Sequence, residues 1–266
     1  MDYRKLCLNA IDIIHKTGEY IKRESQAFTQ QMVETKSHNS FVSYVDLKAE
    51  QRLVDGLDKL LPEAGFITEE ETIRKSGEVF NWVIDPLDGT TNFIHGLPVY
   101  SISVALMENG KPVIGIVYEV ERHETFYTWV NGAAYRNGYK INVSSSPTLS
   151  ESLLATGFPY HDFAIMDSYF EILKELLPNT RGLRRMGSAA IDLAYVACGR
   201  FDAYFEYGLS HWDVAAGAFL VQQAGGVAGR FEENSKHSTG DQILASNGKI
   251  HQEILSIITE KMMASE

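Results

Sequence analysis

The spacing of apolar positions changes along the chain and predicts its elements in turn. In residues 2–25 apolar side chains recur every three or four positions among charged ones, which predicts an amphipathic helix. A second helix is expected where a polar segment ends, because Ser43 and Asp46 have the spacing of a capping box. Short apolar runs at 64–68 and 80–84 then predict two strands.

The strand pattern dominates residues 100–143. Asn109-Gly110 separates two apolar runs and predicts a hairpin, and Asn131-Gly132 predicts another. From about residue 150 helices and strands are expected to alternate, with helices over 164–177, 188–199, 213–224 and 248–262 and strands near 201–206 and 227–231. We therefore expect two lobes of helices packed on sheets: an N-terminal α+β lobe over 1–147 and a C-terminal α/β lobe over 148–266.

Composition narrows the class of protein. The 266 residues are 44 % hydrophobic and 22 % charged, which is ordinary for a globular protein with a sizeable core. The formal net charge of -11 argues against a sequence-independent nucleic-acid binder, which needs a basic face, but allows a phosphorylated substrate whose charge metal ions neutralise. No apolar run has the length of a signal-peptide core or a membrane span, so we expect a cytoplasmic protein without membrane contact.

The segment WVIDPLDGTTNFI, residues 82–94, places two carboxylates at the end of an apolar strand. Asp85 ends the strand, and Asp88 follows on a turn that Gly89 allows to bend closely around a ligand. Thr90 and Thr91 can start a short helix whose first N–H groups bind an anion. Taken alone, the same residues are also typical of an Asx turn that caps a helix.

Carboxylates end two other junctions as well. Glu69 and Glu70 follow a predicted strand, and Asp213 begins a predicted helix. Singly, Glu70 reads as a surface charge and Asp213 as a helix cap. Clustered carboxylates repel one another unless cations bind, and oxygen-only sites select magnesium, manganese or calcium over zinc. Together with an anion cradle, these acids indicate metal-assisted phosphoryl hydrolysis.

Two segments, WVIDPLDGTTNF and WDVAAGAFLVQQAGG, together resemble the signature stretches of the inositol monophosphatases. The likeness extends to FITEE and to GSAAIDLAYVACGRFDAYFEYG, and so covers nearly the whole chain. It implies an α/β fold of the sugar-phosphatase type, in which helices and mixed sheets alternate in layers. It also implies a homodimer and a magnesium-dependent, lithium-sensitive phosphatase that takes small phosphorylated substrates.

The resemblance assigns metal ligands residue by residue. Glu70, Asp85 and the backbone carbonyl of Leu87 would hold a first magnesium ion. Asp85 would bridge to a second ion that Asp88 and Asp213 also hold. The resemblance further implies a weaker third ion near Glu70, and manganese is an alternative to magnesium.

The resemblance also assigns the catalytic and substrate-binding groups. Thr90, backed by Asp46, would orient the attacking water, and Glu70 would act beside them. The substrate contacts that it implies are those of Asp88, Gly89, Thr90, Ala189, Glu206 and Asp213. Gly89 and Thr90 would bind the phosphate through backbone N–H groups, whereas Ala189, Glu206 and Asp213 would meet ring hydroxyls.

Three positions depart from the family pattern. Thr68 stands where a glycine commonly precedes the two glutamates, so the approach of that loop is expected to differ. The loop from Lys36 to Asp46 is one residue shorter than in the animal enzymes, which leaves Lys36 between a site role and a surface role. Ser210 replaces a histidine of the animal enzymes next to the pocket acid and leaves substrate preference open.

The leading prediction is a phosphatase for inositol monophosphate or similar small sugar phosphates. Within the same superfamily the alternatives are a nucleotide 3'-phosphatase, a histidinol-phosphate phosphatase and a fructose 1,6-bisphosphatase. Thr91 favours the inositol type, since the nucleotide and histidinol branches more often carry lysine there. From another functional class, the alternative is a binding partner of nucleic-acid machinery. A nicotinamide-dependent oxidoreductase is disfavoured, because no GxGxxG opens a helix after a strand.

Overall fold

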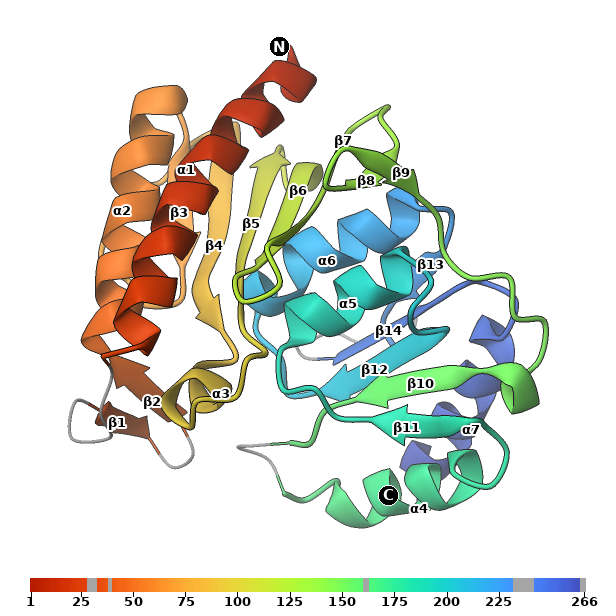
Figure 1. Cartoon of the computed structure of the whole chain (residues 1–266). Coiled ribbons are helices and arrows are strands. Elements are labelled where there is room, and N and C mark those ends of the chain that lie inside the picture. Colours follow the sequence, from red (N-terminus) through yellow and green to blue (C-terminus); the bar gives the residue numbers. More distant parts are fainter. Residues whose placement is uncertain (28–32, 38–39, 160–162, 232–241, 264–266) are drawn as a thin grey trace.

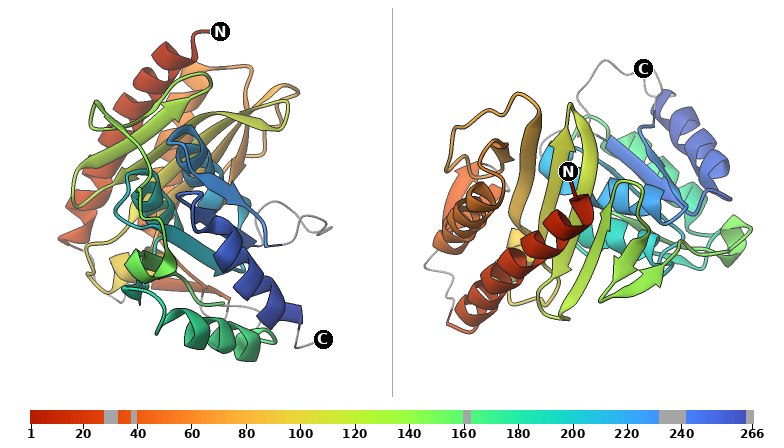
Figure 2. Two further views of the ribbon diagram at one scale, coloured as in Figure 1. Left: turned by 90° about the vertical axis from the view of Figure 1, so that its right-hand side faces the viewer. Right: turned by 90° about the horizontal axis from the view of Figure 1, so that it is seen from above.

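The computed structural model describes residues 1–27, 33–37, 40–159, 163–231 and 242–263. Its helices and sheets form five stacked layers (Figures 1 and 2). In order these are two helices, a seven-stranded sheet, two further helices, a five-stranded sheet and a last pair of helices. The expected layered α/β sandwich is therefore confirmed.

The first helix layer consists of α1 (Tyr3–Ser25) and α2 (Tyr44–Leu60), and it covers the outer face of the large sheet. Between them β1 (Val33–Ser37) and β2 (Ser40–Ser43) form a small antiparallel pair. The predicted capping box begins α2, since the Ser43 hydroxyl accepts from the backbone and Ser43 N donates to the Asp46 carboxylate. This cap has a second consequence, because it also fixes the orientation of a buried acid.

The seven strands of the large sheet have the order β3-β4-β5-β6-β7-β8-β9. Their bounds are β3 (Gly65–Thr68), β4 (Phe80–Asp88), β5 (Ser101–Glu108), β6 (Lys111–Glu119), β7 (Glu124–Trp129), β8 (Ala134–Arg136) and β9 (Tyr139–Ile141). Apart from the parallel β3–β4 pair, all neighbours are antiparallel. The Asn109-Gly110 hairpin is confirmed, with positive φ at both residues as its two-residue turn requires. The short helix α3 (Thr90–Ile94) follows β4 directly.

The smaller sheet has the order β11-β10-β12-β14-β13. Its strands are β10 (Leu153–Thr156), β11 (Gly182–Arg184), β12 (Ala203–Tyr207), β13 (Val227–Gly229) and β14 (Gln242–Ser246), and η2 (Leu149–Glu151) is a single 3-10 turn before them. Its outer face packs on α4 (Met166–Leu176) and α7 (His251–Met263). The four helices predicted after residue 150 are thus present within a few residues, whereas β10, β11 and β14 were missed.

Two helices, α5 (Ala189–Ala197) and α6 (His211–Gln223), lie between the two sheets (Figure 1). Their apolar side chains share one core with residues of both sheets, such as Val83 on β4 and Tyr204 on β12. A Cβ on Gly217 would lie 2.5 Å from Leu193, so glycine is required for α6 to approach α5 this closely. The division into lobes near residue 147 stays a prediction, because the sheets separate there while α6 packs on both.

An ion pair joins the large sheet to the segment after α5. Arg200 on that segment donates two hydrogen bonds to Glu124 on β7, at 2.5 and 2.7 Å. Arg200 holds the pKa of the Glu124 carboxyl below its usual value, chiefly through these bonds. The pair is partly shielded from water, with side-chain exposures of 28 % and 15 %.

Replacing Glu124 by glutamine is expected to lower the free energy of unfolding by about 1–2 kcal/mol at pH 7. A lowered carboxyl pKa stabilises the fold above the unfolded-state value, about 4.3, and this contribution is lost as pH falls through the folded-state pKa. Urea unfolding at pH 7 and pH 4 should therefore show a smaller difference from wild type at pH 4. Glu171→Gln, which removes an exposed ion pair with Lys174, should change stability by less than about 0.5 kcal/mol at both values.

Within the ranges given above, none of the helices combines the length and the apolar character that crossing a bilayer requires.

Candidate active site

Strand β4 carries both aspartates of the sequence motif. In a regular strand, residues three apart point to opposite faces of the sheet. Here the register with β5 shifts, because Asp85 pairs with Ser103 and Asp88 pairs with Ser101. Three steps on β4 thus match two steps on β5, and such a bulge places both aspartates on the same face. The bulge contains Pro86 and Leu87. Because of it, Asp85 and Asp88 point into one acidic site although they are three residues apart.

Protein donors hold one oxygen of each of three carboxylates. Asp85 Oδ1 accepts from Leu87 N at 2.9 Å. Asp88 Oδ2 accepts from the Ser188 hydroxyl at 2.6 Å and from Ala190 N at 2.7 Å, both at the start of α5. Asp213 lies in the first turn of α6, where a capping box with Ser210 gives it the Ser210 N–H at 2.6 Å. The three acids are therefore held in place from β4, α5 and α6.

These three acids act on one another electrostatically. Burial raises the pKa of Asp85, and the charges of Glu69, Asp88 and Asp213 raise it further. Burial and then the charge of Asp88 raise the pKa of Asp213 in the same way. The bonds from Ser188 and Ala190 only partly offset the effect of burial on Asp88. Without a cation, the group therefore retains protons at a pH where exposed aspartates have lost them.

This donor set fits a divalent cation in its chemistry. Hard carboxylate oxygens, buried and mutually repelling, are the ligands that magnesium prefers, and a cation would remove the repulsion. In the described part of the chain, however, no three His, Cys, Asp or Glu side chains are already arranged around a common point that could hold an ion. The residues that would hold an ion here are Asp85, Asp88 and Asp213, which already act on one another.

The acidic loop after β3 lies beside this group. Glu69 N donates to Ile84 O at 3.2 Å, and the charge of Glu69 acts on Asp85. The predicted ligand Glu70 follows, half-buried, with its backbone N–H bound to Glu50 Oε2 at 2.8 Å. The metal role of Glu70 stays a prediction, and the position of Glu69 makes it a second candidate for that role.

Glu50 was not identified from the sequence, yet it shapes this loop. It is fully buried on α2, and it accepts from the backbone N–H groups of Glu70 and Thr72 and from the Thr72 hydroxyl, at 2.7–2.8 Å. Its position in the helical stripe of 44–60 reads as an ordinary charged residue, so the sequence offers no signal for this role.

Replacing Glu50 by glutamine is expected to lower the free energy of unfolding by about 1–3 kcal/mol, because the amide turns a donor toward the loop N–H groups. The loop with Glu69 and Glu70 would then lose its fixed position, so magnesium affinity should fall as well. Thermal unfolding and calorimetric titration with magnesium measure the two effects. Gln51→Ala, one residue away on the exposed face of α2, is the control. A Glu50→Gln variant with unchanged magnesium affinity would show that Glu50 does not position this loop for metal binding.

Thr90 and Asp46 are brought together as predicted. The Thr90 hydroxyl lies 3.1 Å from Asp46 Oδ1 and 2.9 Å from the carbonyl of Leu87. The other oxygen of Asp46 is held by Ser43, and burial raises the pKa of this acid. Thr90 thus stands between a buried acid and the strand carbonyl that the resemblance names as a ligand. The catalytic role of this pair stays a prediction.

Gly89 connects β4 to α3 and has a backbone conformation that favours glycine. Its φ is 94°, and a Cβ there would lie 2.9 Å from Val99 O and 3.1 Å from Gly187 O. No side chain caps α3 in the described structure. The first N–H groups of this short helix are those that the resemblance assigns to the phosphate.

A second group of buried residues surrounds Glu206 on β12. Tyr204 donates to Glu206 Oε2, and burial raises the pKa of Glu206 to about 7. A Cβ on Gly157 would lie only 1.9–2.0 Å from the Glu206 carboxyl atoms, so glycine is required there for Glu206 to keep its position. Ala189, the first residue of α5, is also buried. Contacts of Glu206 and Ala189 with a substrate stay predictions.

Asp192 on α5 is a further buried acid that sequence reasoning missed. Its Oδ1 has no hydrogen-bond partner among the described residues. Burial and the charges of Glu206 and Asp88 raise its pKa, while Arg185 acts in the opposite direction. Asp192 therefore lies between the group around Asp88 and the group around Glu206. An acid in the helical stripe of α5 gave no signal in the sequence.

The remaining predicted residue is Lys36. It belongs to β1, and its side chain lies outside the part of the structure that is described. Its role stays a prediction.

Comparison with known proteins shows the family of this chain. The model of the inositol monophosphatase family matches residues 2–263. The Nus factor SuhB of Pseudomonas aeruginosa is 40 % identical over 94 % of both chains. The solved structure of the suhB protein of Bartonella henselae has a TM-score of 0.88 at 33 % identity, covering 95 % of this chain and 98 % of that one. The IMPase of Thermotoga maritima has a TM-score of 0.86 at 32 % identity, covering 96 % and 97 %. The chain therefore belongs to the inositol monophosphatase family.

Proposed function

We propose that this protein is a magnesium-dependent phosphomonoesterase that hydrolyses inositol monophosphate or similar small sugar phosphates. One observation carries the proposal: the β4 bulge and α6 bring Asp85, Asp88 and Asp213 to one buried site beside the start of α3. The solved structures of relatives support it, since they include SaIMPase-II with inositol monophosphate bound. The choice of inositol monophosphate or a similar sugar phosphate as the substrate is also part of the proposal.

In the proposed enzyme Asp85, Asp88 and Asp213 hold the metal ions together with Glu70 and the Leu87 carbonyl. Bound there, magnesium supplies the positive charge that acidifies a water, neutralises the phosphate and stabilises the leaving alkoxide. The number of ions, two or three, belongs to the proposal.

The chain itself does the positioning. Thr90, whose hydroxyl donates to Asp46, would orient the attacking water by accepting a hydrogen bond from it at the hydroxyl oxygen. The backbone N–H groups of Gly89 and Thr90 hold the phosphate. Glu206 keeps one oxygen on Tyr204 and offers the other, with Ala189 and Asp213, to hydroxyls of the leaving group. No side chain needs to form a bond to phosphorus.

Phosphate release from a series of small esters tests the proposal. Hydrolysis of inositol 1-phosphate that requires magnesium and falls with lithium is the expected result. A preference for fructose 1,6-bisphosphate, a nucleotide 3'-phosphate or histidinol phosphate would replace the substrate and leave the chemistry intact. No release from any of them would refute the phosphatase.

The same assay decides between Glu69 and Glu70 as the ligand of the acidic loop. Glu70→Gln is expected to lower kcat/KM by about 100-fold or more, as loss of a charge from a metal site does. Glu69→Gln should cost about tenfold or less, because its charge acts on Asp85 from outside the ligand set. The reverse order would move the ligand role to Glu69.

A second candidate function comes from the names of the relatives. Proteins named Nus factor SuhB are 36–40 % identical to this chain in several bacteria. We therefore propose that association with nucleic-acid machinery is a further role of the chain. It predicts that the Asp88→Asn variant, inactive as a phosphatase, still replaces the SuhB protein of Escherichia coli in cells that lack it. Failure of this variant, alongside success of the wild type, would tie that role to hydrolysis. The homodimer and the cytoplasmic location stay predictions.

A further inference from the structure

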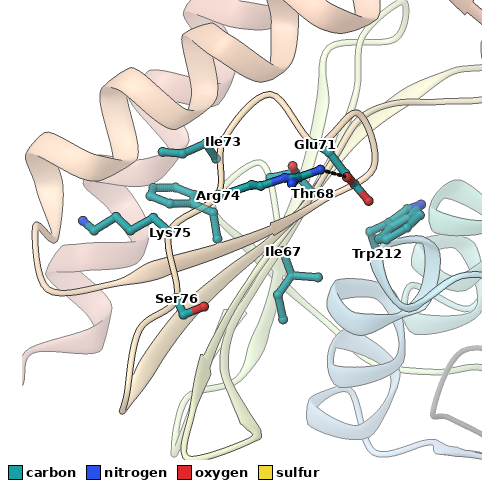
Figure 3. Close-up of a pocket in the computed structure, with 9 residues that line it drawn as sticks. Ile67, Thr68, Glu71, Ile73, Arg74, Lys75, Ser76 and Trp212 are labelled. Carbon is teal, nitrogen blue, oxygen red and sulfur yellow. Dashed lines mark ion pairs between the residues drawn. The ribbon is translucent and has the colours of Figure 1, made fainter.

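The first turns of α6 contribute to two pockets. One, of about 410 Å³, lies between Trp212 and the loop after β3, and it borders the proposed active site, since Trp212 directly precedes Asp213 (Figure 3). The other, of about 240 Å³, lies between α6, the β5–β6 hairpin and the β13–β14 pair. Of the described residues assigned above to the metal, the phosphate or the ring hydroxyls, none lines this second pocket.

The second pocket, called the hairpin pocket below, has mostly apolar walls. One face of α6 and the two sides of the β5–β6 hairpin supply them, with Val214, Ala215, Ala218, Phe219, Met107 and Pro112. An apolar cavity of about 150 Å³ is large enough to bind benzene. The hairpin pocket is larger, so it has room for a flat body of two fused rings.

The polar groups of the hairpin pocket favour an anion. The only charged side chain among the described lining residues is that of Arg230, directly after β13, although the chain as a whole has a net charge of -11. A guanidinium has five N–H donors, so it can bind an added carboxylate besides any partner that it has within the chain. Most ligand pockets combine apolar walls with a small number of such groups.

The hairpin pocket also contacts the turn of α6 that carries Asp213. His211 and Val214 both line the pocket, and Asp213 lies between them in the sequence. The capping box with Ser210 forms this same turn. A ligand packed against the turn binds this conformation and therefore favours it over others. Because the conformation places Asp213 where the charge of Asp88 acts on it, the ligand should strengthen magnesium binding there.

We propose that the hairpin pocket binds a small aromatic carboxylate, whose rings lie against α6 and the hairpin and whose carboxylate pairs with Arg230. The bound ligand regulates the proposed active site by raising its affinity for magnesium. Binding in the pocket is independent of the proposed function, whereas the effect on magnesium rests on it.

Matched ligands and variants test the pocket in EDTA, where no metal is bound. 2-Naphthoate and 2-naphthamide have the same two rings and differ in charge, and calorimetry is expected to show about tenfold tighter binding of the carboxylate. Arg230→Gln should remove this preference. Ala218→Leu should abolish binding of both ligands, because its side chain fills the space of the rings. Arg74→Gln, at an arginine that is 89 % exposed and outside the pocket, should change neither.

Two results in wild type would overturn the site. One is the absence of naphthoate binding, and the other is an equal Kd for the carboxylate and the amide. The comparison of the two ligands needs no variant, so it decides the role of charge even if Arg230→Gln fails to fold. Thermal unfolding of Ala218→Leu shows whether a loss of binding comes from a filled pocket or from a damaged fold.

The link to the active site is measured with both ligands present. Saturating magnesium is expected to raise the affinity for 2-naphthoate about fivefold, and saturating 2-naphthoate should raise magnesium affinity by the same factor. Asp213→Asn should lose this link and still bind 2-naphthoate in EDTA. A Kd for 2-naphthoate that bound magnesium leaves unchanged would overturn the regulation. A wild type that binds 2-naphthoate but no magnesium would refute the proposed metal site, and the pocket would stand.

Discussion

Replacing Asp88 by asparagine is expected to lower kcat/KM by about 10³-fold, or about 4 kcal/mol of transition-state stabilisation, while the fold survives. The carboxylate is partly buried in the site, and the loss of its charge removes one of the four acids that would hold the metal. The asparagine carbonyl can still accept from Ser188 and Ala190, which now hold Asp88 Oδ2. Steady-state kinetics over a magnesium series and thermal unfolding separate the two effects.

The control is Asp55→Asn, since Asp55 is an exposed aspartate on α2 whose carboxylate accepts a hydrogen bond from Gln51. It should leave kcat/KM within a factor of two. Near-normal turnover of Asp88→Asn at saturating magnesium would contradict the metal role of Asp88, whatever the behaviour of the control.

The second large effect is expected for Gly157→Ala. The added Cβ would lie within 2.0 Å of the Glu206 carboxyl, and Glu206 is buried on all sides, so the acid must move. We expect kcat/KM for inositol 1-phosphate to fall about 10- to 100-fold, mainly through KM, because the acid assigned to the ring hydroxyls is displaced. A substrate without such hydroxyls, p-nitrophenyl phosphate, should lose much less.

Gly229→Ala is the matched control, since a Cβ on Gly229 has no atom within 4 Å. It should change neither kcat nor KM. An unaltered KM for inositol 1-phosphate in Gly157→Ala would show that Glu206 does not contact the leaving group.

The larger elements could be predicted because their signals are local. The helical stripes of α1 and α2, the capping box at Ser43 and the Asn109-Gly110 turn depend on residues close in sequence. The strands β10, β11 and β14 are short, and each is stabilised by partners distant in sequence. Nothing within four or five residues announces such a strand, because its hydrogen bonds and its apolar contacts come from the rest of the fold.

The residues of the site likewise fall into those that the sequence predicted and those that it did not. The family motif named Asp85, Asp88, Thr90 and Asp213, and the structure brings them to one region. The sequence did not predict how these residues come together, because a bulge at Pro86 and Leu87 decides which face of the sheet Asp88 occupies. The supporting residues were missed for a similar reason. Glu50 acts on a loop twenty residues away, and the need for glycine at 157 arises from a side chain on another strand.

The position of α6 between the two sheets has a consequence for the life of the protein in a cell. Asp213 reaches the acidic site only when α6 is packed on both sheets, so the proposed metal site is complete only in the fully folded chain. A ligand that binds the folded state alone shifts the folding equilibrium toward it. Proteases that cleave transiently opened chains would then degrade the protein faster when magnesium is scarce. Magnesium supply would thus set how long each molecule persists, as well as how fast it works.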